Sequence, residues 1–191
     1  MNGQGTAISA REMRLLAAAR GGDRTAFADL VRDAAPALER LALRLLGHRQ
    51  DAEDVAQDAV FAAWRQLDGF RGRARFKTWI CRILVHRSLD VLRRRKPTTT
   101  LEAVPSATAD PGPAAAASDR ELEALVRAEV ERLPPVQRAT LLLRADQGLS
   151  YDEIAYVLGS TRNAVRMNLV AARKKLAQRL AGVVDLGEGS A

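Results

Sequence analysis

Apolar residues in the first half of the chain recur at intervals of three, four and seven positions. That spacing places their side chains on one face of an α-helix. The pattern predicts three helices, which run from Thr25 to Gly47, from Asp51 to about Asp68 and from Phe76 to Arg95. Residues 1–19 carry no comparable pattern, so we expect a loose N-terminal arm there.

Helical spacing resumes only after a stretch of different composition. Residues 97–117 are rich in threonine, proline and alanine and hold too little large apolar surface to offset the entropy of ordering, which predicts a linker. Ser118 and Glu121 fit a capping box that opens the next helix. Further helices are expected over 136–146, 150–158 and 161–180. The predicted fold is all-α, with two small helical domains at 20–96 and 118–181, a flexible linker between them and a tail at 182–191.

The segment from Ser150 to Val165 has the layout of a helix-turn-helix. Ser150 and Glu153 form a second capping box, Ala155 is small where two helices must cross, and Gly159 can adopt the positive φ of a tight turn. Such a fold presents the start of its last helix to base edges in duplex DNA. Three basic residues further along this helix are placed to meet phosphates: Arg173, Lys174 and Lys175. An ordinary helical hairpin with a basic solvated face is the alternative interpretation.

Positive charge and aromatic rings gather in one place. Between Arg71 and Lys96 there are ten basic residues and a single acid, Asp90, so this stretch alone carries +9 against +7 for the whole chain. Five of the eight aromatic residues fall between Phe61 and Trp79. Rings stack on unpaired bases while cations follow the backbone, so the pattern favours a site for single-stranded DNA. The alternative for Phe76 and Trp79, which lie at helical spacing, is packing in the core.

Acidic residues precede this basic stretch and mark a second candidate surface. Asp51, Glu53, Asp54 and Asp58 fall near the start of the second predicted helix, where acids also suit the helix dipole. The functional interpretation is a docking face for a basic partner protein, and the alternative is a solvated helix end.

Taken together, these segments resemble the extracytoplasmic-function sigma factors, group IV of the bacterial sigma factors, over about residues 20–180. DAEDVAQDAVFAAW (51–64) is similar to the family segment that binds the clamp helices of the RNA polymerase β′ subunit. FRGRARFKTWICRILVHRSLDVLRRRK (70–96) resembles the segment that melts and reads the −10 promoter element. LSYDEIAYVLGSTRNAVRMNLVAARKKL (149–176) is similar to the helix-turn-helix that reads the −35 element.

The resemblance implies a sigma region 2 domain at 20–96, a sigma region 4 domain at 118–181, and three sets of site residues. The residues predicted to bind core polymerase are Asp51, Glu53, Asp54, Gln57, Asp58, Phe61 and Trp64. Those predicted to bind the −10 element are Arg71, Arg73, Arg75, Phe76, Lys77, Trp79, Arg82, His86 and Arg87. Those predicted to bind the −35 element are Ser160, Thr161, Arg162, Asn163, Arg166, Met167, Arg173 and Lys174.

Several positions depart from the family pattern. Met167-Asn168 stands where a Ser-Arg pair is common, and Val170 and Ala171 replace polar or basic residues. His86 replaces an asparagine near the base pocket, and Arg73 replaces an acidic loop residue. These differences predict altered −35 and −10 preferences.

No motif for catalysis, a cofactor or a metal ion is present, and the single cysteine, Cys81, is expected to be a buried thiol. The resemblance therefore implies a non-enzymatic initiation factor. Its expected partners are the β′ and β subunits of core RNA polymerase, duplex and single-stranded promoter DNA, and an anti-sigma factor. We expect a cytoplasmic protein without a membrane insertion, associated with the nucleoid when it is part of the holoenzyme. A stand-alone helix-turn-helix regulator and a sigma-like decoy that sequesters an anti-sigma factor are the alternative functions.

Overall fold

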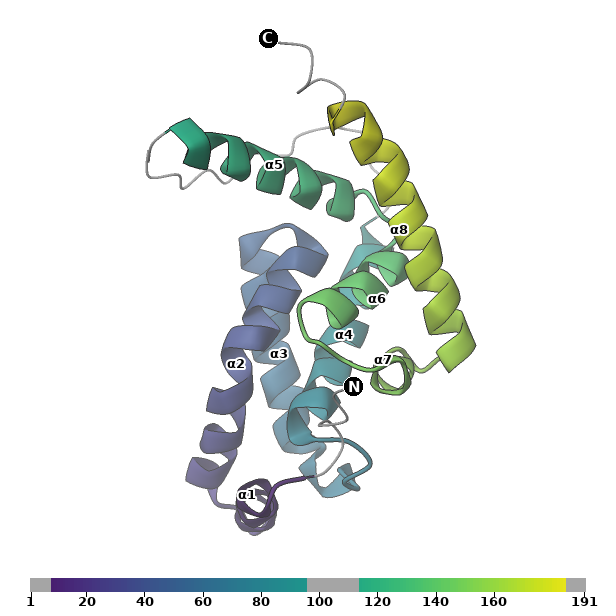
Figure 1. The fold of residues 1–191 in the computed structure, drawn as a ribbon. Helices are drawn as coiled ribbons and strands as arrows, with labels where there is room; N and C mark the ends of the chain where they lie inside the picture. Colours follow the sequence, from purple (N-terminus) through teal and green to yellow (C-terminus); the bar gives the residue numbers. More distant parts are fainter. Residues whose placement is uncertain (1–7, 96–113, 185–191) are drawn as a thin grey trace.

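The computed structural model describes residues 8–95 and 114–184, which form α-helices and one short 3-10 helix, with no strand in these two ranges (Figure 1). In the first range the elements are α1 (Ala10–Arg20), α2 (Arg24–Leu46), α3 (Arg49–Arg65), η1 (Leu67–Gly69) and α4 (Phe76–Arg94). In the second they are α5 (Ala114–Glu131), α6 (Pro135–Ala145), α7 (Tyr151–Leu158) and α8 (Arg162–Val184). The predicted all-α fold class is confirmed.

Local signals in the sequence set several of the helix ends. Gly47 ends α2 in the left-handed conformation, and its N–H donates to the carbonyl of Leu43. The capping box of Ser150 and Glu153 opens α7, and Gly159 closes that helix with a φ of 62°. Each of these three predictions is confirmed.

The expected loose arm is wrong for residues 10–19, which form α1. Ser9 caps this helix by accepting a hydrogen bond from the N–H of Glu12 at 3.1 Å. Leu16 and Ala19 are buried against the helices that follow. Two fully buried side chains were too few to produce a recognisable periodicity, and Leu15 adds a partly buried contact to this capped helix of eleven residues.

The start of α5 also differs from expectation. The helix begins at Ala114, so Ser118 lies inside the helix and the predicted capping box there is wrong. The reason is the run of alanines from Ala114 to Ala117, since alanine has the highest helix propensity of any residue. These four residues were assigned to the linker, and the rest of the expected linker lies outside the described residues. The helix predicted at Asp51 likewise begins earlier, at Arg49.

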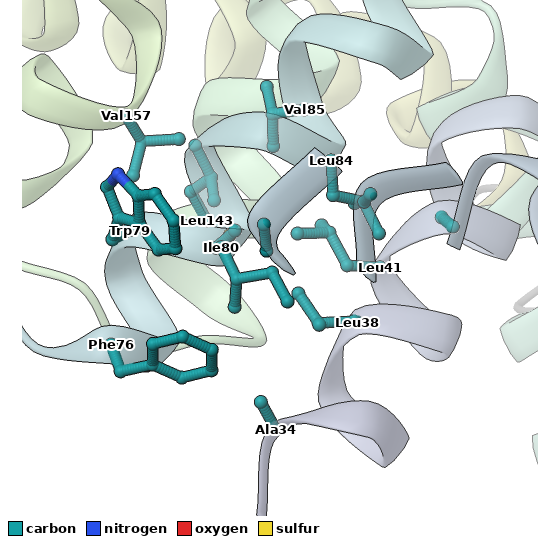
Figure 2. Packing of buried hydrophobic residues seen from close by; sticks show 14 of the residues in the cluster. Ala34, Leu38, Leu41, Phe76, Trp79, Ile80, Leu84, Val85, Leu143 and Val157 are labelled. Atoms are coloured by element: carbon teal, nitrogen blue, oxygen red, sulfur yellow. The ribbon is translucent and has the colours of Figure 1, made fainter. Parts of the chain in front are cut away.

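The two halves of the chain pack against each other around α4. One continuous cluster of buried apolar side chains joins Leu41 of α2 and Ile80 and Leu84 of α4 to Leu143 of α6 and Val157 of α7 (Figure 2). In Figure 1, α6 and α7 lie beside α4, and α5 lies across the end of α2. The two predicted helical domains therefore share one core in this structure.

A buried arginine bonds to both halves at this junction. Arg138 of α6 donates from Nη1 to the carbonyl of Leu45 in α2 at 2.6 Å, and from Nη2 to the carbonyls of Glu131 and Leu133 at the end of α5 and just after it. These acceptors lie where two helices end, and a cation there also interacts favourably with the helix dipole. Burial lowers the pKa of the Arg138 guanidinium, and the nearby Glu131 carboxylate partly offsets this shift. The side chain nevertheless stays charged at neutral pH.

We expect Arg138→Ala to lower the free energy of unfolding by about 2–4 kcal/mol, because buried carbonyls at two helix ends lose their donor. Arg132→Ala is the matched control, since Arg132 is exposed and pairs with Glu129 one helical turn away; its cost should stay below about 1 kcal/mol. Urea denaturation followed by circular dichroism measures both values. Equal costs for the two variants would contradict the anchoring role of Arg138.

Candidate nucleic-acid interface

The helix-turn-helix of α7 and α8 is held by contacts at both ends of its turn. Val165, Leu169 and Ala172 of α8 are fully buried against α6 and α7, which fixes the orientation of the helix. Arg162 Nη1 pairs with Asp152 Oδ2 at 3.0 Å, and the hydroxyl of Thr161 accepts from the N–H of Ala164. The start of α8 is thereby capped and held beside the start of α7.

The opposite face of α8 is open to solvent. All eight side chains predicted to bind the −35 element are exposed: Ser160, Thr161, Arg162, Asn163, Arg166, Met167, Arg173 and Lys174. Lys175 differs, because its Nζ donates to Gln137 Oε1 of α6 at 3.1 Å, so it is turned away from the expected phosphates. The exposed set presents polar and basic groups along the helix, which can meet base edges and phosphates.

The arginine loop before α4 is exposed and is held in place by α1. Arg71, Arg73 and Arg75 are exposed. Glu12 of α1 accepts from the backbone N–H of Phe76 at 2.5 Å and lies 3.7 Å from Arg75 Nε, while Arg20 donates to the carbonyl of Phe70. Both ends of the loop are therefore fixed by one helix, a role for Glu12 and Arg20 that sequence reasoning missed.

The aromatic rings beside this loop are buried in this structure. Phe70, Phe76 and Trp79 are 2%, 2% and 8% exposed and pack on one another, with ring centroids 5.1–6.3 Å apart. The prediction that these rings form an exposed surface for unpaired bases is wrong, and the core alternative holds. The physical reason is that α4 is covered on both sides, by α2 and α3 and by α6 and α7.

Three further residues predicted to bind the −10 element are engaged within the chain. Arg82 donates to the carbonyl of Tyr156 and lies over its ring, with the guanidinium carbon 5.0 Å from the centroid. His86 Nε2 donates to the carbonyl of Val157 at 3.0 Å. Both carbonyls lie in the last turn of α7, at the negative end of the helix dipole, where hydrogen-bond donors and cations interact favourably. Arg87 pairs with Asp58 at 3.0 Å, whereas Lys77 is exposed.

Four of the seven residues predicted to bind polymerase form one exposed stripe, in which Asp58 also pairs with Arg87. Asp54, Gln57, Asp58 and Phe61 recur at helical spacing on the outer face of α3, and Phe61 is 71% exposed. Glu53 is also exposed and bonds to Arg49. Asp51 pairs with Arg95, and Trp64 is half-buried against Phe27, with ring centroids 5.0 Å apart. We name Asp54, Gln57, Asp58 and Phe61 the α3 stripe.

Phe61 is the exposed aromatic side chain of the α3 stripe and sits beside a shallow pocket. The pocket lies between α3 and α4 and is lined by Asp58, Phe61, Ala62, Arg65, Gln66 and Arg87. Arg65 and Gln66, which extend this surface, were not predicted from the sequence. An aromatic anchor next to a pocket with a polar rim is typical of a protein-binding surface.

Cys81 lies within α4 and is buried. Burial raises the pKa of its thiol to about 12, and the charge of Lys77 offsets this only in part. The thiol therefore stays protonated at neutral pH, in agreement with the expected buried cysteine.

Residues 8–95 and 114–184 contain neither a candidate metal site nor a candidate membrane-spanning helix. No group of three or more metal-ligating side chains comes together in these ranges. Among the helices they contain, none combines the length and apolar character needed to cross a membrane.

Two family models match the chain. "Sigma-70 region 2" matches residues 30–98, and "Sigma-70, region 4" matches residues 123–176. The second match contains the helix-turn-helix, and the first contains the α3 stripe, the arginine loop and α4. The two regions in this order define a protein of the sigma-70 class.

Relatives and solved structures narrow the class. The chain is 37% identical over 179 residues to the ECF RNA polymerase sigma factor SigM of Mycobacterium tuberculosis, covering 92% of this chain and 87% of that protein. It is 35% identical over 158 residues to the sigma factor SigE of Mycolicibacterium smegmatis, a match that covers 80% of this chain but spans 61% of the relative. The structure of CnrH in complex with the cytosolic domain of CnrY matches with a TM-score of 0.69 at 30% identity, over 90% of this chain and 98% of that one.

A second solved structure agrees in fold. The sigma factor RpoE of Bartonella quintana, in complex with the anti-sigma factor NepR, matches with a TM-score of 0.66 at 24% identity, over 81% of this chain and 96% of that chain. The chain therefore belongs to the extracytoplasmic-function (ECF) family of RNA polymerase sigma factors, whose members are transcription initiation factors.

We expect Arg82→Ala combined with His86→Ala to loosen α7 from α4, since the last carbonyls of α7 lose both donors. Backbone amides of α7 should exchange with deuterium at least about fivefold faster, while amides of α3 stay unchanged. The control is Arg166→Ala, which removes an exposed arginine of α8 and should leave both rates unaltered. Unchanged exchange in α7 would contradict a fastening role for these contacts.

Proposed function

We propose that this chain binds core RNA polymerase and directs it to promoters, reading the −35 element with α8 and opening the −10 element next to the arginine loop. The supporting observation is that one chain carries two exposed surfaces of opposite character. The α3 stripe is acidic with an aromatic anchor, whereas the outer face of α8 is polar and basic. Family membership supports the same division of labour.

Charge and exposure support the assignment of the polymerase surface to the α3 stripe. Asp54 presents negative charge to solvent beside the exposed ring of Phe61, and Asp58 is exposed but pairs with Arg87. Complementary charge steers association with a basic partner, and a desolvated aromatic ring supplies much of the affinity. The partner we propose for this surface is the clamp helices of the β′ subunit, with the β subunit as a second contact.

The contacts between α4 and α7 support a further step. Arg82 and His86 bond to the last turn of α7, although both were predicted to contact the −10 element. A side chain cannot serve both partners at once. We infer that promoter binding separates α7 from α4 and releases these two side chains for DNA.

Opening of the duplex then depends on binding energy alone, because the family acts without catalysis. Unstacking costs a few kcal/mol per step and must be offset by contacts to phosphates and unpaired bases. Arg71, Arg73 and Lys77 are exposed cations near the start of α4. With the neighbouring rings buried, these cations are the groups that we propose for the single strand.

An anti-sigma factor is the proposed regulator of this chain. The support is family membership and the fold shared with RpoE of Bartonella quintana, whose structure includes the anti-sigma factor NepR. Transcription reconstituted with core polymerase distinguishes the proposed function from the two alternatives, a stand-alone regulator and a decoy. Promoter-dependent transcripts are expected, and a chain that binds DNA or a partner but yields none would contradict the proposal.

We expect Phe61→Ser to weaken binding to core polymerase by at least about tenfold, because the variant removes the exposed aromatic anchor of the α3 stripe. Asp54→Lys, which reverses a charge on the same stripe, should slow association most at low salt. Glu39→Lys makes a comparable charge change on an exposed position of α2 and is the control. Competition binding with fluorescent chain gives the affinities, and equal losses for Asp54→Lys and Glu39→Lys would exclude the stripe as the docking face.

We expect Arg71→Ala with Arg73→Ala to reduce promoter opening while core binding stays unchanged. Permanganate reactivity of −10 thymines in the holoenzyme complex measures the opening. The salt dependence of promoter binding should also become shallower, by about 0.7–0.9 in the log–log slope for each phosphate that the variant no longer neutralises. Arg40→Ala, on an exposed position of α2, is the control. Trp79→Ala and Phe76→Ala are unsuitable here, since both rings are buried and their removal would destabilise the core by about 3–5 kcal/mol.

A further inference from the structure

The solvent-exposed face of α8 has apolar residues at its centre. Asn163, Met167, Val170 and Lys174 follow one another at intervals of four, three and four, so they share one helical face. Met167 and Val170 are 55% and 57% exposed. Polar groups thus lie at both ends of this line, with two neighbouring apolar side chains between them.

This second apolar face is not needed for folding. The buried face of α8 already consists of Val165, Leu169 and Ala172, which are 0%, 1% and 0% exposed. An amphipathic helix needs only one such stripe, and apolar pairs exposed side by side on a protein surface indicate a binding site. Met167 and Val170 lie on the side away from the core, where their burial requires another molecule.

The surroundings of the pair indicate which molecule this is. Arg166 and Arg173, both exposed, flank the line, and Asn163 and Lys174 close its ends. Four polar or cationic groups around a small apolar centre fit a polyanion better than the apolar surface of a protein. In the major groove of DNA one apolar group is presented to a recognition helix, the 5-methyl group of thymine.

We propose that Met167 and Val170 read thymine 5-methyl groups in the −35 element, so that this chain selects its promoters partly by apolar contact. The inference rests on the proposed role of α8 and adds to it the chemistry that decides specificity at two base pairs. Asn163 and Arg166 then supply hydrogen bonds to neighbouring base edges, and Arg173 and Lys174 supply phosphate contacts that fix the register.

The first experiment selects promoters from a duplex library randomised over the −35 region, using holoenzyme assembled with the full chain. Wild-type chain is compared with Met167→Ser and Val170→Ser. Met13→Ser is the matched control, because Met13 of α1 is also 55% exposed but lies away from α8. We expect each α8 variant to lose the preference for thymine at one position and to keep the other preferences, while Met13→Ser selects the wild-type sequence.

The second experiment replaces the selected thymines one at a time by deoxyuridine, which keeps every hydrogen-bonding group and removes only the methyl. Each replacement should weaken wild-type holoenzyme binding about fourfold, equivalent to ~0.8 kcal/mol for one methyl group. The same replacement should leave the affinity of the corresponding serine variant unchanged.

The outcomes separate this inference from the proposed function. A selected −35 sequence that tolerates deoxyuridine at every position would overturn methyl reading while leaving the role of α8 intact. Unchanged selection by both serine variants would also overturn it and would assign the apolar pair to a protein partner. If wild-type holoenzyme selects no −35 sequence at all, the proposed function of α8 fails, and the inference fails with it.

Discussion

Burial of α4 on both sides is the constraint on which the structure depends. Ile80 and Leu84 face the same apolar cluster as Leu41 of α2 and as Leu143 and Val157 on the other half of the chain (Figure 2). A helix with neighbours on two sides needs apolar side chains around most of its circumference. This explains why α4 is rich in aromatic and aliphatic residues and why Phe76 and Trp79 are buried.

Four arginines serve helix ends within the chain. Arg82, Arg95 and Arg138 each donate to carbonyls at or near the end of another helix, and Arg20 does the same for the end of the η1 segment. A guanidinium with five donors suits such sites, since the last carbonyls of a helix have no partner within it. The formal charge of the basic stretch therefore overstates the number of cations free to meet phosphates.

The bonds between α4 and α7 connect stability to function. They fasten the helix-turn-helix to the first half through side chains that the family resemblance assigns to the −10 element. If Arg82 and His86 exchange these carbonyl acceptors for DNA, release of α7 is coupled to promoter binding. The difference in DNA affinity between the chain with α7 bound to α4 and the chain with α7 released then sets the balance. The outer face of α8 remains exposed in this structure, so reading of duplex DNA does not require the same release.

Periodicity and capping are local, so the sequence predicted α2 to α8, the turn residues and the order of the two regions, although α1 was missed. Ser150, Gly47 and Gly159 act within a few residues of themselves. The sequence also placed the exposed residues of α8, whose buried partners recur at helical spacing. Packing between distant segments set the rest. It buries Phe76 and Trp79, places Glu12 and Arg20 against the arginine loop, and brings Arg82 and His86 to α7. Those outcomes depend on contacts between residues that lie 50 to 74 positions apart in the sequence. An aromatic side chain can stack on a DNA base or pack in a core, and no local sequence feature distinguishes these two roles.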